Sequence, residues 1–89
     1  MFNPYRDAGR YFPRQSMRVL QTLRESRPRH YTAIAVDLGE RSNLSNARLI
    51  WLFKHGDVAK AIDVGRGWYV ITRKGIDRLS YLERMDPSV

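Results

Sequence analysis

The sequence predicts an α+β domain, in which helical segments come first, two β-rich segments follow and a further helix ends the chain. In the first half, apolar residues such as Val19, Leu20 and Leu23 recur at helical spacing. Between residues 58 and 72, β-branched and aromatic residues flank a glycine-rich loop, which indicates two paired strands. The order of these segments along the chain narrows the choice of fold.

The composition is that of a folded and strongly basic domain. Of the 89 residues, 43% are hydrophobic and 28% are charged, a typical balance for one globular domain with a single core. The net charge is +7, and most of the basic residues are arginines, whose guanidinium groups match phosphates and guanine edges. Nucleic acid is therefore the first partner to expect, although an Arg-rich surface also follows from a high genomic GC content.

The composition also excludes several classes of site and suggests a location. The chain has no cysteine, so disulfides and cysteine-ligated zinc are excluded. Its longest apolar run, Leu49–Phe53, is too short to cross a bilayer, and the N-terminus lacks the apolar segment of a signal peptide. We expect a cytoplasmic protein without a membrane partner, associated with the nucleoid when it is bound to DNA.

Residues 1–12 lack a clean periodicity and are predicted to form an N-terminal arm, whereas residues 13–86 form the folded domain. Pro13 suits the first turn of a helix, and this helix is expected to end near Ser26, before Arg27-Pro28. Its apolar stripe contains Ser16, Val19, Leu20 and Leu23, with Met17 beside them.

Two further helices are predicted around a polar turn. Thr32 is a suitable N-cap for a short helix over Ala33–Leu38, which Gly39 ends. The third helix is expected at about Leu44–His55, with Ser42 or Asn43 as its cap. Its C-terminal half is apolar almost all round, so we expect that half to be deeply buried.

A β-hairpin and a last helix complete the predicted domain. The strands Val58–Val64 and Trp68–Thr72 are joined by Gly65-Arg66-Gly67, and Thr72 can cap a helix that presents Ile76, Leu79, Leu82 and Met85 on one face. The resulting order is that of a winged helix-turn-helix: three helices, a two-stranded β-hairpin wing and a C-terminal helix.

In such a fold the third helix enters the major groove, with its N-terminal residues facing base edges. The candidate base-reading residues are polar and are expected to be exposed there: Ser42, Asn43, Ser45, Asn46 and Arg48. Asparagine can pair with adenine and arginine with guanine. The alternative is that these residues only cap a buried helix, which accounts for one of Ser42 and Asn43 but not for the other three.

Further candidates lie outside the third helix. Arg66 at the tip of the wing can reach the DNA backbone or a minor groove, or it is simply part of a solvated turn. Arg29, Tyr31 and Thr32 lie where the chain enters the second helix, whose free N–H groups favour phosphate, and Arg41 in the following turn completes the set.

The segment 65–83, GRGWYVITRKGIDRLSYLE, resembles the wing and following helix of archaeal phage-repressor-like and MarR- or PadR-like winged-helix regulators. In those families a wing strand runs into a Thr-x-x-Gly step and a leucine-rich helix, as in Thr72 to Gly75 followed by Leu79. Including the third helix, the resemblance covers about residues 16–85. It implies sequence-specific binding of double-stranded DNA, as a homodimer on an inverted repeat, and hence transcriptional regulation as a repressor.

An enzyme is not expected. His30 and His55 have no acidic partner at ligand spacing, and the chain has neither a metal motif nor a phosphate loop, so we expect no cofactor. Two alternatives stay open: a winged helix that binds another protein, and an architectural protein that binds DNA without sequence preference. The operator, the dimer interface and any small-molecule effector are not given by the sequence.

Overall fold

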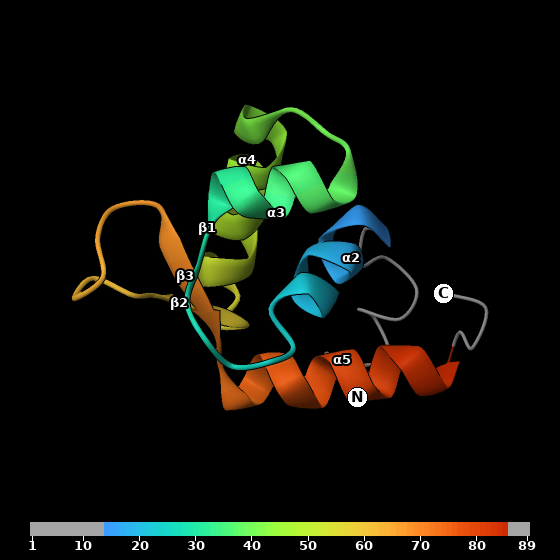
Figure 1. The fold of residues 1–89 in the computed structure, drawn as a ribbon. Helices are drawn as coiled ribbons and strands as arrows, with labels where there is room; N and C mark the ends of the chain where they lie inside the picture. Colours follow the sequence, from blue (N-terminus) through green and yellow to red (C-terminus); the bar gives the residue numbers. More distant parts are fainter. Residues whose placement is uncertain (1–13, 86–89) are drawn as a thin grey trace.

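The computed structural model describes residues 14–85, so the predicted arm, Pro13 and Asp86 lie outside the described residues. The described part is a small α+β domain of four helices and a three-stranded antiparallel sheet (Figure 1). None of these helices has the length and apolar character that crossing a bilayer requires. In chain order, the elements are α2 (Arg14–Thr22), β1 (Arg29–His30), α3 (Tyr31–Leu38), α4 (Ser42–Lys54), β2 (Val58–Lys60), β3 (Trp68–Ile71) and α5 (Arg73–Met85).

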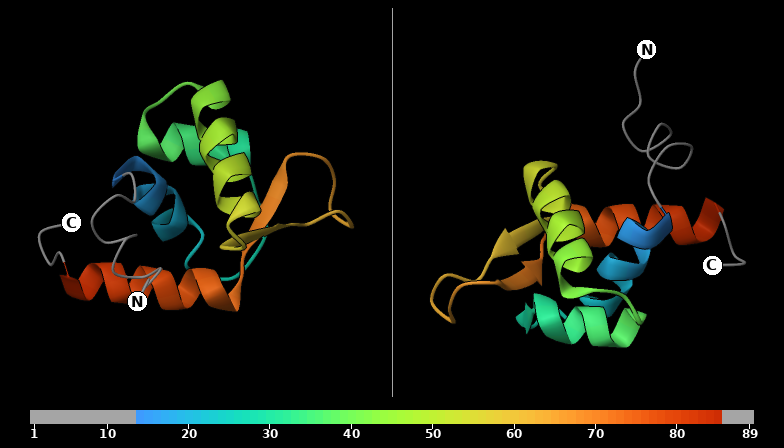
Figure 2. Two further views of the ribbon diagram at one scale, coloured as in Figure 1. Left: turned by 180° about the vertical axis from the view of Figure 1, so that it is seen from behind. Right: turned by 90° about the horizontal axis from the view of Figure 1, so that it is seen from above.

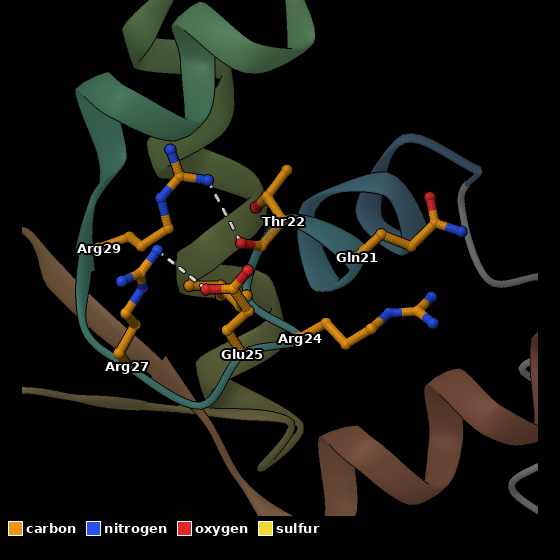
Figure 3. Close-up of a pocket in the computed structure, with 7 residues that line it drawn as sticks. Gln21, Thr22, Arg24, Glu25, Arg27 and Arg29 are labelled. Atoms are coloured by element: carbon orange, nitrogen blue, oxygen red, sulfur yellow. Dashed lines mark hydrogen bonds and ion pairs between the residues drawn. The ribbon is translucent and has the colours of Figure 1, made fainter.

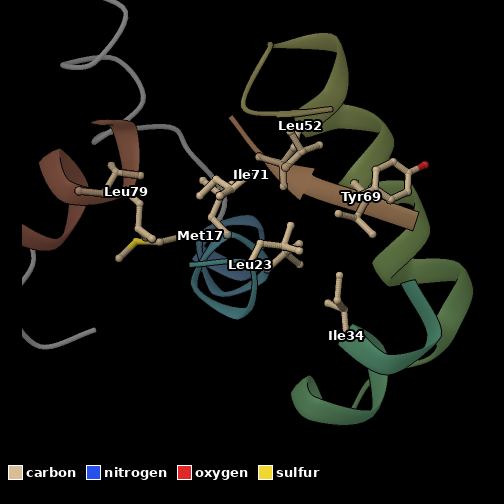
Figure 4. Packing of buried hydrophobic residues seen from close by; sticks show 12 residues of the cluster. Met17, Leu23, Ile34, Leu52, Tyr69, Ile71 and Leu79 are labelled. Carbon is tan, nitrogen blue, oxygen red and sulfur yellow. The ribbon is translucent and has the colours of Figure 1, made fainter. Parts of the chain in front are cut away.

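One hydrophobic core joins the helices to the sheet. The stripe predicted for the first helix is confirmed, because Ser16, Met17, Val19, Leu20 and Leu23 are all buried. Side chains from every described helix and from β2 and β3 meet around this stripe (Figure 4). The core consists of Met17, Val19, Leu20, Leu23, Ile34, Leu49, Leu52, Val58, Tyr69, Ile71, Leu79 and Leu82.

The helix α2 ends at Thr22, so the predicted end near Ser26 is wrong. The Thr22 hydroxyl donates to the carbonyl of Val19 at 2.6 Å, and the next residues form tight turns in which Ser26 adopts a left-handed φ of 61°. Side-chain bonds of this kind compete with the helical pattern. Because α2 ends at Thr22, the residues that follow can cross to the sheet.

The sheet has three strands in the order β1-β3-β2, so the prediction of a two-stranded hairpin was incomplete. The strand β1 pairs with β3 through Arg29 opposite Tyr69 and His30 opposite Trp68. A strand of two residues is too short to show an alternation in sequence, and only its pairing defines it.

The connection between β2 and β3 is residues 61–67, and it is longer than the predicted three-residue loop. The strand β2 ends at Lys60 because the Val64 and Gly65 N–H groups fold back onto the carbonyl of Ala61. The loop therefore exposes Ile62 and Val64, which the predicted strand would have placed in an alternating pattern. It projects beyond the helices, next to the C-terminal end of α4 (Figure 2).

The predicted cap of the last helix is confirmed, because the Thr72 hydroxyl accepts from the Gly75 N–H at 3.1 Å. Leu79 and Leu82 are buried as expected, whereas Ile76 is exposed. The side chain of Met85 lies outside the described residues. The same Thr72 hydroxyl donates to the carbonyl of Gly56 at 2.7 Å, so the cap also ties α5 to the end of α4.

Candidate nucleic-acid interface

The helix α4 buries one narrow side and exposes the other. Ser45, Leu49 and Leu52, at helical spacing, are its buried residues. The expectation of a deeply buried C-terminal half is wrong, because Ile50 and Phe53 are 39% and 41% exposed. The helix contacts α3, α2 and the sheet with one side only. Because its sequence is apolar on all sides, the apolar residues on the opposite side remain exposed to solvent.

The first turn of α4 is open to solvent and is not capped by a side chain. Arg41 is the N-cap residue, with φ −69° and ψ 143°, and it makes no side-chain capping bond. Ser42 and Asn43 are both exposed helical residues, so the prediction that one of them is the cap is wrong. Capping therefore does not occupy the polar groups of this turn.

Ser45 and Arg48 are not available in the way the sequence suggested. Ser45 is 0% exposed, and its hydroxyl donates to Glu40 Oε2 at 2.5 Å. The Arg48 Nε donates to the same carboxylate at 3.3 and 3.4 Å, and the Gln15 Nε2 of α2 donates to it at 3.2 Å. The prediction that Ser45 stands exposed for base contact is wrong, because it is buried against Glu40 in the preceding turn. Arg48 binds the same carboxylate and keeps 29% of its side chain exposed.

These contacts form a polar cluster of Gln15, Glu40, Ser45 and Arg48 that we term the Glu40 cluster. Burial works to raise the pKa of the Glu40 carboxyl, but the bonds from Ser45, Gln15 and Arg48 outweigh it and hold this pKa below its ordinary value. The cluster fixes the turn between α3 and α4 against α2. The one feature of the sequence that could have indicated this cluster is Glu40 itself, a single acidic residue in a basic segment.

Asn46 is the remaining base-reading candidate on the body of α4, and it is half-buried. Asn43, Asn46, Ala47 and Ile50 lie at spacings of three and four residues, and so form one stripe along the exposed side of the helix. Ala47 and Ile50 were not among the sequence candidates. Their position follows from the spacing once the buried residues of α4 are known.

The start of α3 differs from the prediction by two residues. His30, not Thr32, is the N-cap, and its Nδ1 accepts from the Thr32 N–H at 3.3 Å and lies 2.8 Å from the Thr32 hydroxyl. Thr32 is exposed in the first turn. Tyr31 is half-buried, and its N–H donates to the carbonyl of Gly67 at 3.0 Å. The helix α3 thus begins in direct contact with the end of loop 61–67, which stands where the wing was predicted and which we term the wing loop. Gly39 ends α3 in the left-handed conformation, at the predicted position.

Arg29 holds elements of the fold together. Its Nη1 lies 2.7 Å from Asp37 Oδ2 of α3 and donates to the carbonyl of Thr22 at 3.3 Å. Arg24 and Arg27 line the same polar pocket of about 280 Å³ (Figure 3), and they pair with Glu83 and Glu25 respectively. The charge of these arginines is thus compensated within the chain.

The wing loop carries a further cation, Arg66, whose charge is not compensated in the way described for Arg24, Arg27 and Arg29. Arg66 is exposed and makes no hydrogen bond or ion pair with any residue in the described range 14–85. Arg66 and Lys60 line a hollow of about 580 Å³ beside the sheet, together with Ile62, Gly65, Gly67, Trp68 and Tyr69. The Lys60 Nζ lies 4.8 Å from the centre of the Phe53 ring, which places the base of the wing beside α4.

Gly67 brings the wing loop close to the start of α3. It has φ +80°, and a Cβ there would lie 2.6 Å from His30 Nε2 and 2.8 Å from the Tyr31 ring. Each tryptophan packs against a histidine ring: Trp68 meets the His30 ring edge-on at 5.5 Å, and Trp51 stacks on His55 at 3.9 Å.

Within residues 14–85, no three His, Asp or Glu side chains come together as a set that could hold a metal ion. Comparison of the chain with models of protein families, with curated proteins and with solved structures finds no match. The candidate interface is therefore defined by its geometry alone. It consists of the exposed stripe of α4, its first turn with Arg41, and the wing loop with Arg66.

Proposed function

We propose that the chain is a winged helix-turn-helix protein that binds double-stranded DNA with sequence preference. The pair α3–α4 is the helix-turn-helix, α4 enters the major groove, and loop 61–67 is the wing on the backbone or in the minor groove. The sheet order β1-β3-β2 and the projection of the wing loop beside α4 support this assignment.

The observation that carries the proposal is the solvent-exposed, uncapped first turn of α4. Ser42 and Asn43 are exposed there, with Asn46 one turn further along, so hydroxyl and amide groups are free to meet base edges. The cationic residues Arg41 and Lys54 lie at the two ends of the helix, and α4 contains no carboxylate. A phosphate backbone on either side of a groove would find positive charge at both ends.

The roles of the two corrected residues change accordingly. Arg48 and Ser45 are assigned positioning roles, because both bind Glu40 and so orient α4. Phosphate contact is assigned to Arg41, Arg66 and the exposed Thr32 at the start of α3. Arg29 and Tyr31 stabilise the start of α3 and are not assigned a DNA contact.

Regulation of transcription by a homodimer in the cytoplasm is part of the same proposal, and it rests on the resemblance of residues 65–83. A dimer of this kind predicts two half-sites about one helical turn apart. A footprint covering a single half-site, together with a monomeric mass in solution, would contradict the dimer but not DNA binding.

The test is a selection of binding sequences from random duplex DNA, repeated at two salt concentrations. We expect an enriched motif that persists at the higher concentration, because base contacts depend less on salt than phosphate contacts do. Binding without any enriched motif would indicate an architectural protein, and an absence of duplex binding would overturn the proposal.

A winged helix that binds another protein is the second candidate, and the exposed Leu44, Ile50 and Phe53 on α4 favour it. It predicts that substitutions on α4 change assembly and leave the affinity for nucleic acid unchanged. The basic residues at the two ends of α4, Arg41 and Lys54, favour DNA over a protein as the partner.

A further inference from the structure

The exposed stripe of α4 combines amides with apolar side chains in a regular order. Asn43 and Asn46 precede Ala47 and Ile50 on the same side of the helix, with Phe53 less than one turn beyond. Ile50 and Phe53 are among the large apolar residues that the structure leaves exposed. A helix face made for phosphate alone would not place aliphatic groups at its centre.

The same stripe has no arginine or lysine within it. Arg48, the one basic residue in the middle of α4, is held by Glu40 with its Nε 3.3 Å from the carboxylate. Arg41 and Lys54 lie at the ends. The centre of the stripe therefore lacks the guanidinium that commonly binds guanine O6 and N7 together.

The amide and apolar side chains that remain on this stripe match an A·T base pair. An asparagine amide can donate to adenine N7 and accept from adenine N6, and an apolar side chain can contact the thymine C5-methyl group. A G·C pair has no methyl group in the major groove and presents two acceptors and one donor there. Covering these polar groups with Ile50 would remove their hydration without a replacement bond.

We infer that α4 reads A·T base pairs, with Asn43 and Asn46 on adenine and with Ala47 and Ile50 against thymine methyl groups. This inference rests on the proposed function. It differs from the sequence-based expectation, in which Arg48 would have favoured guanine. The occupant of the apolar stripe is thus the methyl-bearing edge of duplex DNA.

Charge favours DNA over a protein partner for this face. The helix α4 carries no acidic side chain, and the cations Arg41, Lys54 and Lys60 surround its exposed side. Lys60 lies over the Phe53 ring, so a positive charge adjoins the apolar end of the stripe. A second copy of this chain would bring the same cations against each other.

The test uses three synthetic duplexes of equal length: alternating dA-dT, alternating dA-dU and alternating dG-dC. Uracil lacks only the C5-methyl group of thymine, so the comparison of the dA-dT duplex with the dA-dU duplex isolates the contact with that methyl group. We expect the full-length protein to bind the dA-dT duplex roughly threefold to tenfold more tightly than the dA-dU duplex, as loss of one or two methyl contacts implies. Binding to dG-dC should be weaker still.

Two variants connect the effect to the stripe. Ile50→Ala should lower the ratio of dA-dT to dA-dU affinity and leave only the part that the Ala47 contact supplies. Ile50→Thr, which keeps the β-branch and adds a hydroxyl, should lower the ratio as well. Val36→Ala is the matched control, because Val36 is an aliphatic residue that is 80% exposed on α3 and not on α4. Its ratio should equal that of the unmodified protein.

The outcomes separate this inference from the proposed function. Equal binding to dA-dT and dA-dU overturns the methyl contact and leaves DNA binding in place. If none of the three duplexes binds, the proposed function fails and the inference with it. If Ile50→Ala changes the sedimentation of the protein without changing the affinity ratio, the stripe is a protein interface and the inference is wrong.

Discussion

Asp57 Oδ2 lies 2.9 Å from Arg78 Nη1, with the two side chains 0% and 5% exposed. Asp57 precedes β2 and Arg78 lies in α5, so this ion pair joins the start of the sheet to the last helix. Neither residue was identified from the sequence, because their partnership is defined only by the packing. Burial raises the pKa of Asp57, and the nearby Arg78 opposes that rise.

Replacing one member of this pair should be costly. Arg78→Met leaves a buried carboxylate without its cation, and we expect the free energy of unfolding to fall by about 3–5 kcal/mol in urea denaturation. The double variant Asp57→Asn with Arg78→Met should recover part of that loss, because no buried charge is then left uncompensated. An equal loss in the single and double variants would show that the charge is not the cause.

The Glu40 cluster predicts a dependence of stability on pH. The folded-state pKa of Glu40 is below its ordinary value of 4.5, so the unfolded chain binds the proton first. The contribution of Glu40 is therefore fully present above that value and is lost as the pH falls through the lowered folded pKa. Glu40→Gln should reduce stability near neutral pH, and its difference from the unmodified protein should shrink as the pH falls below 4.5 and through the lowered folded pKa.

The measurement is denaturant unfolding of both proteins across that range of pH. Asp57, whose pKa is raised, has the opposite sign: its contribution is greatest below 3.8 and declines as the pH rises. Since Asp57 is present in both proteins, it cancels in the comparison. A constant difference at every pH would contradict the role assigned to Glu40.

Gly75 should not tolerate a side chain. A Cβ at this position would lie 2.1 Å from the carbonyl oxygen of Asp57, which is backbone and cannot move aside. We expect Gly75→Ala to cost about 3 kcal/mol or more, the upper range for overpacking, and so to lower the melting temperature by more than about 10 °C. Gly39→Ala is the control.

Gly39 has φ +66°, and a Cβ added there would have no other atom within 4 Å, so alanine at this position meets only backbone strain. That strain is worth about 1–2 kcal/mol. If Gly39→Ala were the more destabilising of the two, the close approach of α5 to Asp57 would not be the limiting contact.

The candidate interface predicts two kinds of loss in DNA binding. Asn43→Ala or Asn46→Ala should weaken binding to a selected site by roughly 1–3 kcal/mol and should affect unrelated duplexes little. Arg66→Ala should weaken binding to all duplexes and reduce the slope of log affinity against log salt by about one. Titrations by fluorescence anisotropy at several salt concentrations distinguish these patterns, and uniform losses from all three variants would contradict the division.

Local signals predicted much of the fold. The apolar stripe of α2, the stop at Gly39 and the Thr72 cap depend on residues close together in sequence, and all three are confirmed. The strand β1 was missed because two residues have no periodicity. For the interface, Ser42 and Asn43 were correctly expected to be exposed, whereas Ser45 is buried and both Ser45 and Arg48 bind Glu40, a pairing that the sequence did not indicate.

The bond between the Tyr31 N–H and the carbonyl of Gly67 has a mechanical consequence for the wing. Together with the pairing of β1 and β3, it fastens the returning end of the loop to α3, and the turn at Ala61 fastens the outgoing end. Residues 62–66 lie between these two attachments, with the Val64 and Gly65 N–H groups bonded to the carbonyl of Ala61. In the proposed complex, Arg66 would lie between these two attachments, so its side chain and not the helices would adjust to the width of the groove.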